Sequence, residues 1–560
     1  MKRYLRPLGA SLLCGAVLAL AACSSSSTSS ATSAASGAAT SSGSSTSGQN
    51  GGTITIDSGT APLSADQALD FTTQGNELYS VVNTPLLTFQ RGVQGVAGAK
   101  IIPGLAKALP TVSKDGKTYT FFLRSGLHYS NGTAIKASDV TYALERDLKV
   151  PWQAASFVSG YIVGAEAYAT GKAKTISGIT TDDATGKVVV NLVAPFAPIE
   201  DIFALAGTAP VPTTTAMKNL ANTGTIGDGP YMWSTITPNQ TYTLVQNPKF
   251  DVPGLPRGHA AKIVYQVNSN VTANAEAVLQ NQADVFDPGD TVPASLLSQI
   301  QSQAKDRYQA IPTNSSYYWW FNVNEKPFNN LYARQAVLAA LDDSALSRLD
   351  SGFLQPDCHL IPPGIAGGSN GAATCPYHNA NAAPNLTEAK ALMAKSGMVG
   401  QPVTVYGEER SPRTQWLDYY TSVLNSLGFK ATEKVVNSSV YFTTIGAPSL
   451  KPQTGFGDWV QDFPNPWDFM QLFAGNAGSS LNYGYVNDAH YNTTLNTLFQ
   501  SQPDAVKSQW TALDNYAVSQ GYYASFGHQE FPKFYSDRLN YNAGVLSTEY
   551  QTDLTSLELK

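Results

Sequence analysis

The sequence predicts an α/β protein of two or three domains, and three observations support this prediction. The chain has 560 residues, of which about 510 follow a low-complexity N-terminal stretch, and single hydrophobic cores stop growing well below that size. Residues 118–124 alternate apolar and polar side chains after an Asp115-Gly116 turn, as a β-strand does. Residues 138–148 then space their apolar side chains at the helical interval.

The other expected elements follow in chain order. Residues 53–56 alternate as a strand. Ser138 is expected to cap the helix over 138–148, with Asp139 in its first turn. Residues 317–320, Tyr-Tyr-Trp-Trp, predict a buried strand with one ring reaching a binding cleft.

Two later helices carry clear start and stop signals. Asn385, in a capping box with the glutamate three residues on, predicts a helix that ends at Gly397. Ser411-Pro412 predicts the N-cap and first residue of another helix, which Gly428 closes. The stretch Gly457–Phe469 follows; its two prolines predict a stiff loop after a short strand.

The first 23 residues predict a bacterial lipoprotein signal. Three basic residues precede the apolar stretch Leu8–Ala22, which is shorter than the roughly 20 residues of a spanning helix. Leu-Ala-Ala then leads to Cys23, where cleavage and lipidation of the thiol are expected. The alternative is an ordinary secretory peptide with an incidental cysteine.

Residues 24–50 are nearly all Ser, Thr, Ala and Gly and cannot bury enough apolar surface to fold. They predict a disordered tether whose reach is on the order of 30 Å. Signal and tether together place the protein at the outer face of the cytoplasmic membrane, anchored by lipid in a bacterial cell envelope. No other apolar run is long enough to span a bilayer.

Composition and motifs exclude several functions. A formal charge of −6 with 14% charged residues argues against nucleic acid as a partner. The chain has no His-Glu-x-x-His and no phosphate-binding Gly-Lys-Ser/Thr loop. Gly367–Gly371 fits Gly-x-Ser-x-Gly in letters but lacks the strand and helix that such a nucleophile requires. We therefore expect no enzyme activity and no cofactor.

Two cysteines remain in the predicted mature chain. Cys358 and Cys375 flank a loop rich in Gly, Ala and Pro, and an oxidising compartment favours a disulfide between them. The alternative is a zinc site formed by both cysteines with His359 and His378.

Residues 119–146, Tyr-Thr-Phe-Phe-Leu-Arg through the Asp-Val helix, resemble the signature of the family 5 extracellular solute-binding proteins. These are the oligopeptide-, dipeptide- and nickel-type binding components of ABC importers. Gly227–Tyr231 is similar to the family's Gly-Thr-Gly-Pro-Tyr turn, and residues 318–342 to its aromatic strand and Arg-Gln-Ala helix. The resemblance extends from about residue 51 to 540.

The resemblance implies a bilobal periplasmic-binding-protein fold of class II, the large three-domain type. The first lobe would be discontinuous, the ligand would lie between the lobes, and the protein would be a monomer that docks on a permease and ATPase complex. The implied ranges are 51–86, 211–315 and 528–560 for the first lobe, 87–210 for the extra domain and 316–527 for the second lobe.

Asp462 is the first candidate ligand-binding residue. It lies between Trp459 and Phe463, and no Lys or Arg occurs within ten residues of it. A carboxylate against aromatic rings needs a cation or several donors, so either a ligand supplies the cation or Asp462 caps a turn through backbone N–H groups. The resemblance implies that Asp462 binds the α-ammonium of a peptide and that Trp459 forms a wall of a side-chain pocket.

Arg413 is the second candidate, because the resemblance places basic residues near the ligand at this point. Arg410 or Arg413 could meet a ligand carboxylate; the alternative for Arg413 is a helix-start residue that faces water. An oligosaccharide, a metal chelate or a role as a peptide-sensing receptor stays open. No metal-binding residue is expected in the cleft, because a metal chelate needs ligands there and no His lies near Asp462.

Overall fold

The computed structural model describes residues 50–560, apart from 94, 151, 153, 288–291, 293, 369–374, 378–379, 381, 479, 541–544, 548 and 550. The predicted signal, with Cys23, and the tether up to residue 49 lie outside the described residues. No helix in the described part of the chain is long and apolar enough to cross a membrane.

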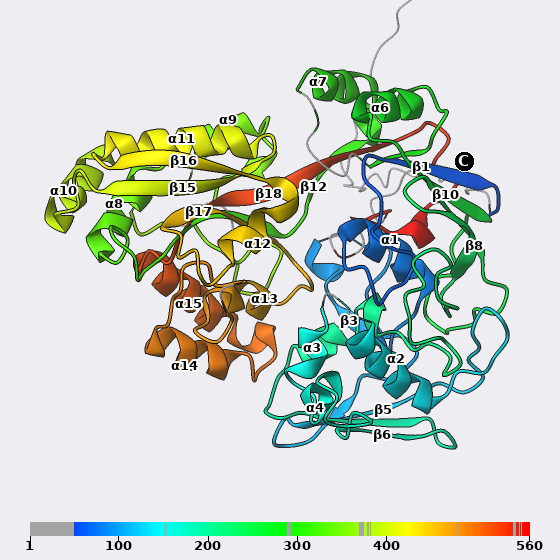
Figure 1. Cartoon of the computed structure of the whole chain (residues 1–560). Helices are drawn as coiled ribbons and strands as arrows, with labels where there is room; N and C mark the ends of the chain where they lie inside the picture. The colour runs from blue at the N-terminus through cyan, green and yellow to red at the C-terminus, as the bar shows by residue number, and fades with distance from the viewer. Residues whose placement is uncertain are drawn as a thin grey trace, which may run out of the picture. The chain divides into compact units, whose positions relative to one another are not determined.

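Twelve strands form one mixed sheet (Figure 1). They are β1 (Thr53–Ser58), β8 (Tyr231–Thr237), β9 (Thr241–Gln246), β10 (Lys262–Val267), β11 (Val285–Asp287), β12 (Tyr308–Pro312), β13 (Ser315–Phe321), β14 (Leu354–Gln355), β15 (Pro402–Glu409), β16 (Lys430–Asn437), β17 (Thr454–Val460) and β18 (Tyr523–Tyr535). The order is β16-β15-β17-β13-β18-β11-β1-β10-β9-β8, with β12 and β14 also paired to β18. β1 pairs parallel with β10 and β11, whereas β13 pairs antiparallel with β17 and β18.

The long strand β18 joins the two halves of this sheet. Residues 523–527 of β18 pair with β13, and Phe534 and Tyr535 pair with β11. Between these points β18 pairs with β14 and β12. All seven residues of β13 are buried, which confirms the buried strand predicted at residues 317–320.

A separate four-stranded sheet has the order β4-β5-β7-β6. Its strands are β4 (Thr111–Val112), β5 (Thr118–Phe122), β6 (Ile179–Asp182) and β7 (Lys187–Asn191). Two smaller pairs are β2 (Leu87–Phe89) with β3 (Ile101–Pro103), and β19 (Leu546–Ser547) with β20 (Gln551–Thr552). The predicted domain boundaries stay predictions.

Helices lie between the strands, as the predicted α/β class requires. They are α1 (Thr73–Val82), α2 (Ala137–Lys149), α3 (Ser156–Ser159), α4 (Ala165–Ala169), α5 (Ile199–Ile202), α6 (Val271–Leu279), α7 (Ala294–Gln303), α8 (Leu331–Ala340), α9 (Asp343–Leu349), α10 (Leu386–Ser396), α11 (Arg413–Ser426), α12 (Tyr441–Ile445), α13 (Pro466–Met470), α14 (Ala489–Leu498) and α15 (Lys507–Ser519).

The start of α2 differs from the prediction. The helix begins at Ala137 with Lys136 as its N-cap, so the predicted capping role of Ser138 is wrong. The Ser138 hydroxyl instead donates to Asp183 at 3.0 Å. Asp139 takes over the helix start, because its carboxylate accepts the Lys136 N–H at 2.9 Å.

Buried Arg146 of α2 forms an ion pair with Asp66, which lies in the segment before α1. Its guanidinium donates to both carboxylate oxygens of Asp66, at 2.9 and 2.5 Å, and to the carbonyls of Ala216 and Lys218. Arg146 is 1% exposed. Since this residue ends the signature found in the sequence, the signature has a structural role here.

The two later helices agree with their signals to within one residue. The Asn385 side chain accepts the backbone N–H at the third helical position, and Gly397 has a φ of 66° at the end of α10. Helix α11 begins at Arg413 with Pro412 as N-cap, one residue later than predicted. The buried ion pairs of Arg413 with Glu408 and Asp458 hold that first turn in place.

The predicted stiff loop Gly457–Phe469 is shorter than expected. Its first four residues complete β17, and its last four belong to α13. Asn465 caps α13 by accepting the Trp467 N–H at 3.1 Å, and Pro466 stands at the first helical position, where proline needs no N–H partner. The loop proper is therefore Gln461–Asn465.

Candidate functional site

Three neighbouring hollows lie beside the β17–α13 loop, and Phe71 borders all of them. We call them the inner, aromatic and basic hollows, with volumes of about 130, 530 and 320 Å³. The inner hollow includes Glu77, Asn83, Arg91, Asp462 and Glu549. The aromatic hollow includes Phe157, Tyr161, Trp459, Asp462, Trp467 and Phe499. The basic hollow includes Tyr317, Arg410, Arg413, Trp416 and Asp458.

Asp462 lies on the wall that the inner and aromatic hollows share. Among the described residues no Lys, Arg or His forms an ion pair with its carboxylate. Burial raises the pKa of Asp462 to about 7. Burial and the charge of Asp462 also raise the pKa of its neighbour Asp468. At neutral pH Asp468 is therefore protonated and Asp462 is close to half ionised, and a cation bound beside Asp462 would favour its ionised form.

The alternative in which Asp462 caps a turn is wrong for this structure. In this loop the capping carboxylate belongs to Asp468, which accepts the backbone N–H of Asp462 at 2.8 Å. Within the described part of the chain, no backbone N–H donates to the Asp462 carboxylate. The Asp462 carboxyl interacts with the Asp468 side chain, and its remaining acceptor positions are left available to a ligand.

Trp459 lies at the end of β17 and borders the aromatic hollow next to Asp462. Several other rings border the hollow and contact one another. The Phe157 and Trp467 ring centres are 6.3 Å apart, and those of Tyr161 and Trp467 are 5.8 Å apart. Such a surface suits a large apolar or aromatic ligand group.

Arg413 borders the basic hollow but already has two carboxylate partners. It is 7% exposed, contacts Glu408, and donates to Asp458 Oδ2 at 2.6 Å. Its guanidinium also lies 4.7 Å from the centre of the Phe456 ring. The alternative of a residue facing water is therefore wrong, and the ligand-binding role of Arg413 stays a prediction. Tyr317 of β13 is the ring that reaches this hollow.

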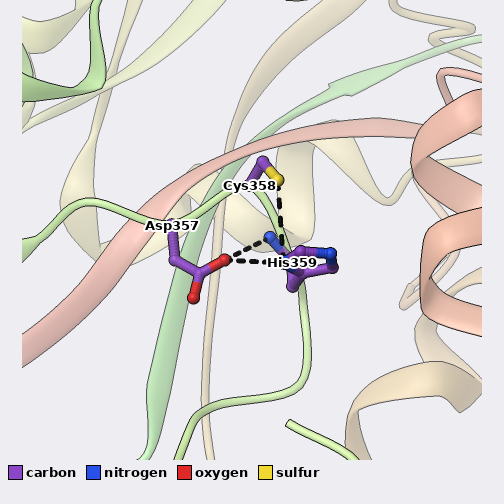
Figure 2. A group of neighbouring side chains, drawn as sticks. All are labelled: Asp357, Cys358 and His359. Atoms are coloured by element: carbon purple, nitrogen blue, oxygen red, sulfur yellow. Dashed lines mark hydrogen bonds and ion pairs between the residues drawn. The ribbon is translucent and has the colours of Figure 1, made fainter. Parts of the chain in front are cut away.

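The two predicted disulfide cysteines lie together, away from the three hollows. Their Sγ atoms are 2.07 Å apart, which is the distance of a disulfide bond. Figure 2 shows Cys358 between Asp357 and His359, whose Nδ1 lies 2.8 Å from Asp357 Oδ1. Ligand atoms of these three residues lie within 4.8 Å of one another. Of the four predicted zinc ligands, His378 lies outside the described residues.

The electrostatics around His359 are those of an ion pair. Burial alone would lower the pKa of His359, but Asp357 and Asp514 raise it to about 9. The imidazole is therefore charged at neutral pH, and a protonated imidazole cannot ligate a metal. This geometry favours the disulfide over the zinc site.

Sequence reasoning missed Glu77, Asn83 and Glu549, which border the inner hollow together with Asp462. Glu77 alone carried a signal, because an acidic residue lies directly before the stretch Leu78–Val82, which contains three aliphatic residues and a tyrosine. Asn83 and Glu549 belong to segments with no local pattern that points to a site.

Comparisons with known proteins identify the family to which this chain is similar. A family model described as bacterial extracellular solute-binding proteins, family 5 Middle, matches residues 100–480. The oligopeptide-binding protein OppA of Bacillus subtilis (strain 168) is 25% identical over 437 residues, which are 73% of this chain and 75% of that protein. The dipeptide-binding protein DppE of the same organism is 26% identical over 401 residues, 67% and 69% of the two chains.

The fold also has a close solved counterpart. The structure titled "Clavulanic acid biosynthesis oligopeptide binding protein 2" superposes with a TM-score of 0.83 at 20% identity, over 91% of this chain and 96% of that one. This likeness confirms the predicted bilobal fold. Because the family model covers more than half of the sequence, the chain belongs to the bacterial extracellular solute-binding proteins of family 5, which are binding components of transporters and not enzymes.

Proposed function

We propose that this protein captures extended peptides between its two lobes and delivers them to the permease of an ABC importer. Asp462 would bind the α-ammonium group of the peptide. One observation carries the proposal: a half-buried carboxylate, Asp462, borders two hollows and has no cationic partner among the described residues. Both relatives named above are peptide-binding proteins by name, which supports a peptide as the ligand.

The edge of β17 supports an extended ligand. β13 pairs with β17 along its whole length, but β15 pairs only with Thr454 and Gly455. Residues 457–460 are thus without a strand partner on that side in the described structure. A peptide could add main-chain hydrogen bonds there while its side chains occupy the hollows. Trp459 would then form a wall of a side-chain pocket, and Arg410 or Arg413 would lie toward the ligand's carboxylate.

The test is a calorimetric titration of the purified protein with a library of peptides of about two to five residues, each also supplied N-acetylated. We expect free-amino peptides to bind and their acetylated copies to bind at least roughly 30-fold more weakly, because acetylation removes the charge that pairs with Asp462. Equal binding of the two sets would contradict the role of Asp462. Binding of an oligosaccharide or a metal chelate, with no peptide bound, would overturn the peptide proposal.

Peptide affinity should rise with pH. An ammonium pairs with the ionised carboxylate, and burial places the pKa of Asp462 at about 7. Raising the pH from 5.5 to 7.5 should therefore lower Kd roughly 20-fold, until the peptide amino group itself deprotonates near pH 8. Titrations in buffers of matched ionic strength measure this. The Asp462→Asn variant is the control and should show a smaller pH dependence, which Glu77 and Glu549 of the same hollow would supply; an equal pH dependence in the two proteins would contradict the prediction.

We further propose that Cys23 carries the lipid anchor and that Cys358 and Cys375 form a disulfide. The cysteines are 17 residues apart in sequence, and a loop of that size stabilises by about 3 kcal/mol. Reduction should lower the free energy of unfolding by that amount. Alkylation of the unfolded protein without reductant, followed by mass spectrometry, should leave both cysteines unlabelled. Labelling of both would show that they are free thiols.

A further inference from the structure

Two side chains of the inner hollow have hydrogen-bonding groups with no partner. Neither Oδ1 nor Nδ2 of Asn83 forms a hydrogen bond among the described residues, and the same holds for both carboxylate oxygens of Glu77. Each residue is 1% exposed. Buried polar groups nearly always have partners, so four unpaired atoms on one wall point to something that occupies the hollow.

The hollow also gathers three carboxyl groups. Glu77, Asp462 and Glu549 all border it, and burial raises the pKa of each to about 7, so that they are partly protonated at neutral pH when no cation is bound. The cation on its wall, Arg91, already pairs with Asp553 at 3.0 Å. An added cation would favour ionisation of the three carboxyls and would compensate their burial.

Lys533 does not act as the cation that pairs with Glu77. Its charge lowers the pKa of Glu77 by less than burial raises it, and its ammonium donates to the Thr552 hydroxyl at 3.1 Å. No ion pair within 4.0 Å joins it to Glu77 in the described structure. Thr552 lies near enough for its hydroxyl and backbone N–H to lower the pKa of Glu77 as well, but neither Glu77 oxygen has a hydrogen bond of normal geometry among the described residues.

The spacing of these groups disfavours a metal ion held by all three carboxylates and favours a larger cation. Among the described residues, only Asp357, Cys358 and His359 have three potential ligand atoms within 4.8 Å of one another. The three carboxylates of the inner hollow thus do not converge on one ion. Its volume of about 130 Å³ is several times what one water molecule needs.

We propose that the inner hollow binds the guanidinium group of an arginine side chain close to the amino end of the peptide. This inference rests on the proposed function, since Asp462 holds the amino end on the wall of the same hollow. A guanidinium is planar and offers five donors. It can bind the two free oxygens of Glu77 side by side and still donate to Asn83 Oδ1. The preferred substrates are therefore basic peptides.

Matched peptides with arginine or citrulline test this proposal, because citrulline keeps the shape of arginine and is uncharged. We would place the residue at position one, two or three of otherwise identical alanine tetrapeptides and measure Kd by calorimetry. At one of the three positions the arginine peptide should bind at least roughly 10-fold more tightly than the citrulline peptide. Citrulline-to-arginine ratios of Kd below twofold at all three positions would overturn the inference.

The Glu77→Gln variant locates the effect. It should reduce the citrulline-to-arginine ratio of Kd to below threefold, whereas the matched control Glu276→Gln, on the exposed side of α6, should keep the wild-type ratio. An unchanged ratio in Glu77→Gln would overturn the assignment. If Glu77→Gln does not fold, the citrulline-to-arginine ratio of Kd for the wild-type protein alone tests the inference.

N-acetylated copies separate this inference from the proposed function. If acetylation abolishes binding and arginine gives no advantage, Asp462 binds the amino end and the guanidinium site is refuted. If the arginine advantage survives acetylation without loss of affinity, the guanidinium site stands and the role given to Asp462 fails.

Discussion

Replacing Asp462 with Asn should weaken the binding of free-amino peptides by about 2–5 kcal/mol, which is roughly 30-fold to several thousand-fold in Kd. The substitution keeps the size of the side chain and removes the charge that would pair with the α-ammonium. It also removes the half-buried carboxyl beside buried Asp468, whose pKa the charge of Asp462 raises, so the free energy of unfolding should stay the same or rise. Calorimetry gives the affinity, and chemical denaturation gives the stability.

Asp504→Asn is the matched control, because Asp504 is exposed on the segment before α15. It should leave both measurements unchanged. An Asp462→Asn protein that binds free-amino peptides as tightly as the wild type would remove the central support for peptide binding through the amino end. The ligand would then have to use other groups of the three hollows.

Replacing Arg146 with Met should lower the free energy of unfolding by about 3–5 kcal/mol, because it leaves the Asp66 carboxylate buried without its partner. Arg146 and Asp66 are 1% and 0% exposed, so water cannot take over the lost bonds. Peptide affinity should not change, since neither residue borders the three hollows. Guanidinium chloride unfolding and calorimetry measure the two quantities.

Arg348→Met provides the comparison. The Arg348 side chain is 69% exposed and lies 3.5 Å from Asp342, so its loss should cost about 1 kcal/mol or less. Similar losses for the two variants would show that the buried pair contributes no more than a surface pair. A loss of peptide affinity in Arg146→Met would indicate that the signature acts on the site.

Local signals were sufficient where one segment determines its own structure. The Asp115-Gly116 turn, the alternating strand after it and the Asn385 cap correspond to observed elements because their partners lie a few residues away. The Ser138 cap was wrong for the opposite reason: its hydroxyl found Asp183, 45 residues further on. The Asp139 carboxylate instead accepts the Lys136 N–H at the start of the helix.

The candidate site was predicted only in part, because it is assembled from distant segments. Asp462 and Trp459 could be singled out because the thirteen residues of Gly457–Phe469 combine acidic side chains with several aromatic rings and two prolines. Glu77, Asn83 and Glu549 meet Asp462 only after the chain has folded. No periodicity links residues that far apart, and the unpaired atoms of Asn83 are a property of packing alone.

The position of β18 has a consequence for the order of folding. β1 ends at residue 58 and β18 begins at residue 523, yet β18 is the strand that joins β13 to β11. On the ribosome it emerges after all the other strands of the twelve-stranded sheet. The two halves of that sheet therefore have no shared strand until residues 523–535 have been made, and contacts so distant in sequence form slowly. Joining the two halves is thus the last step in forming this sheet during synthesis.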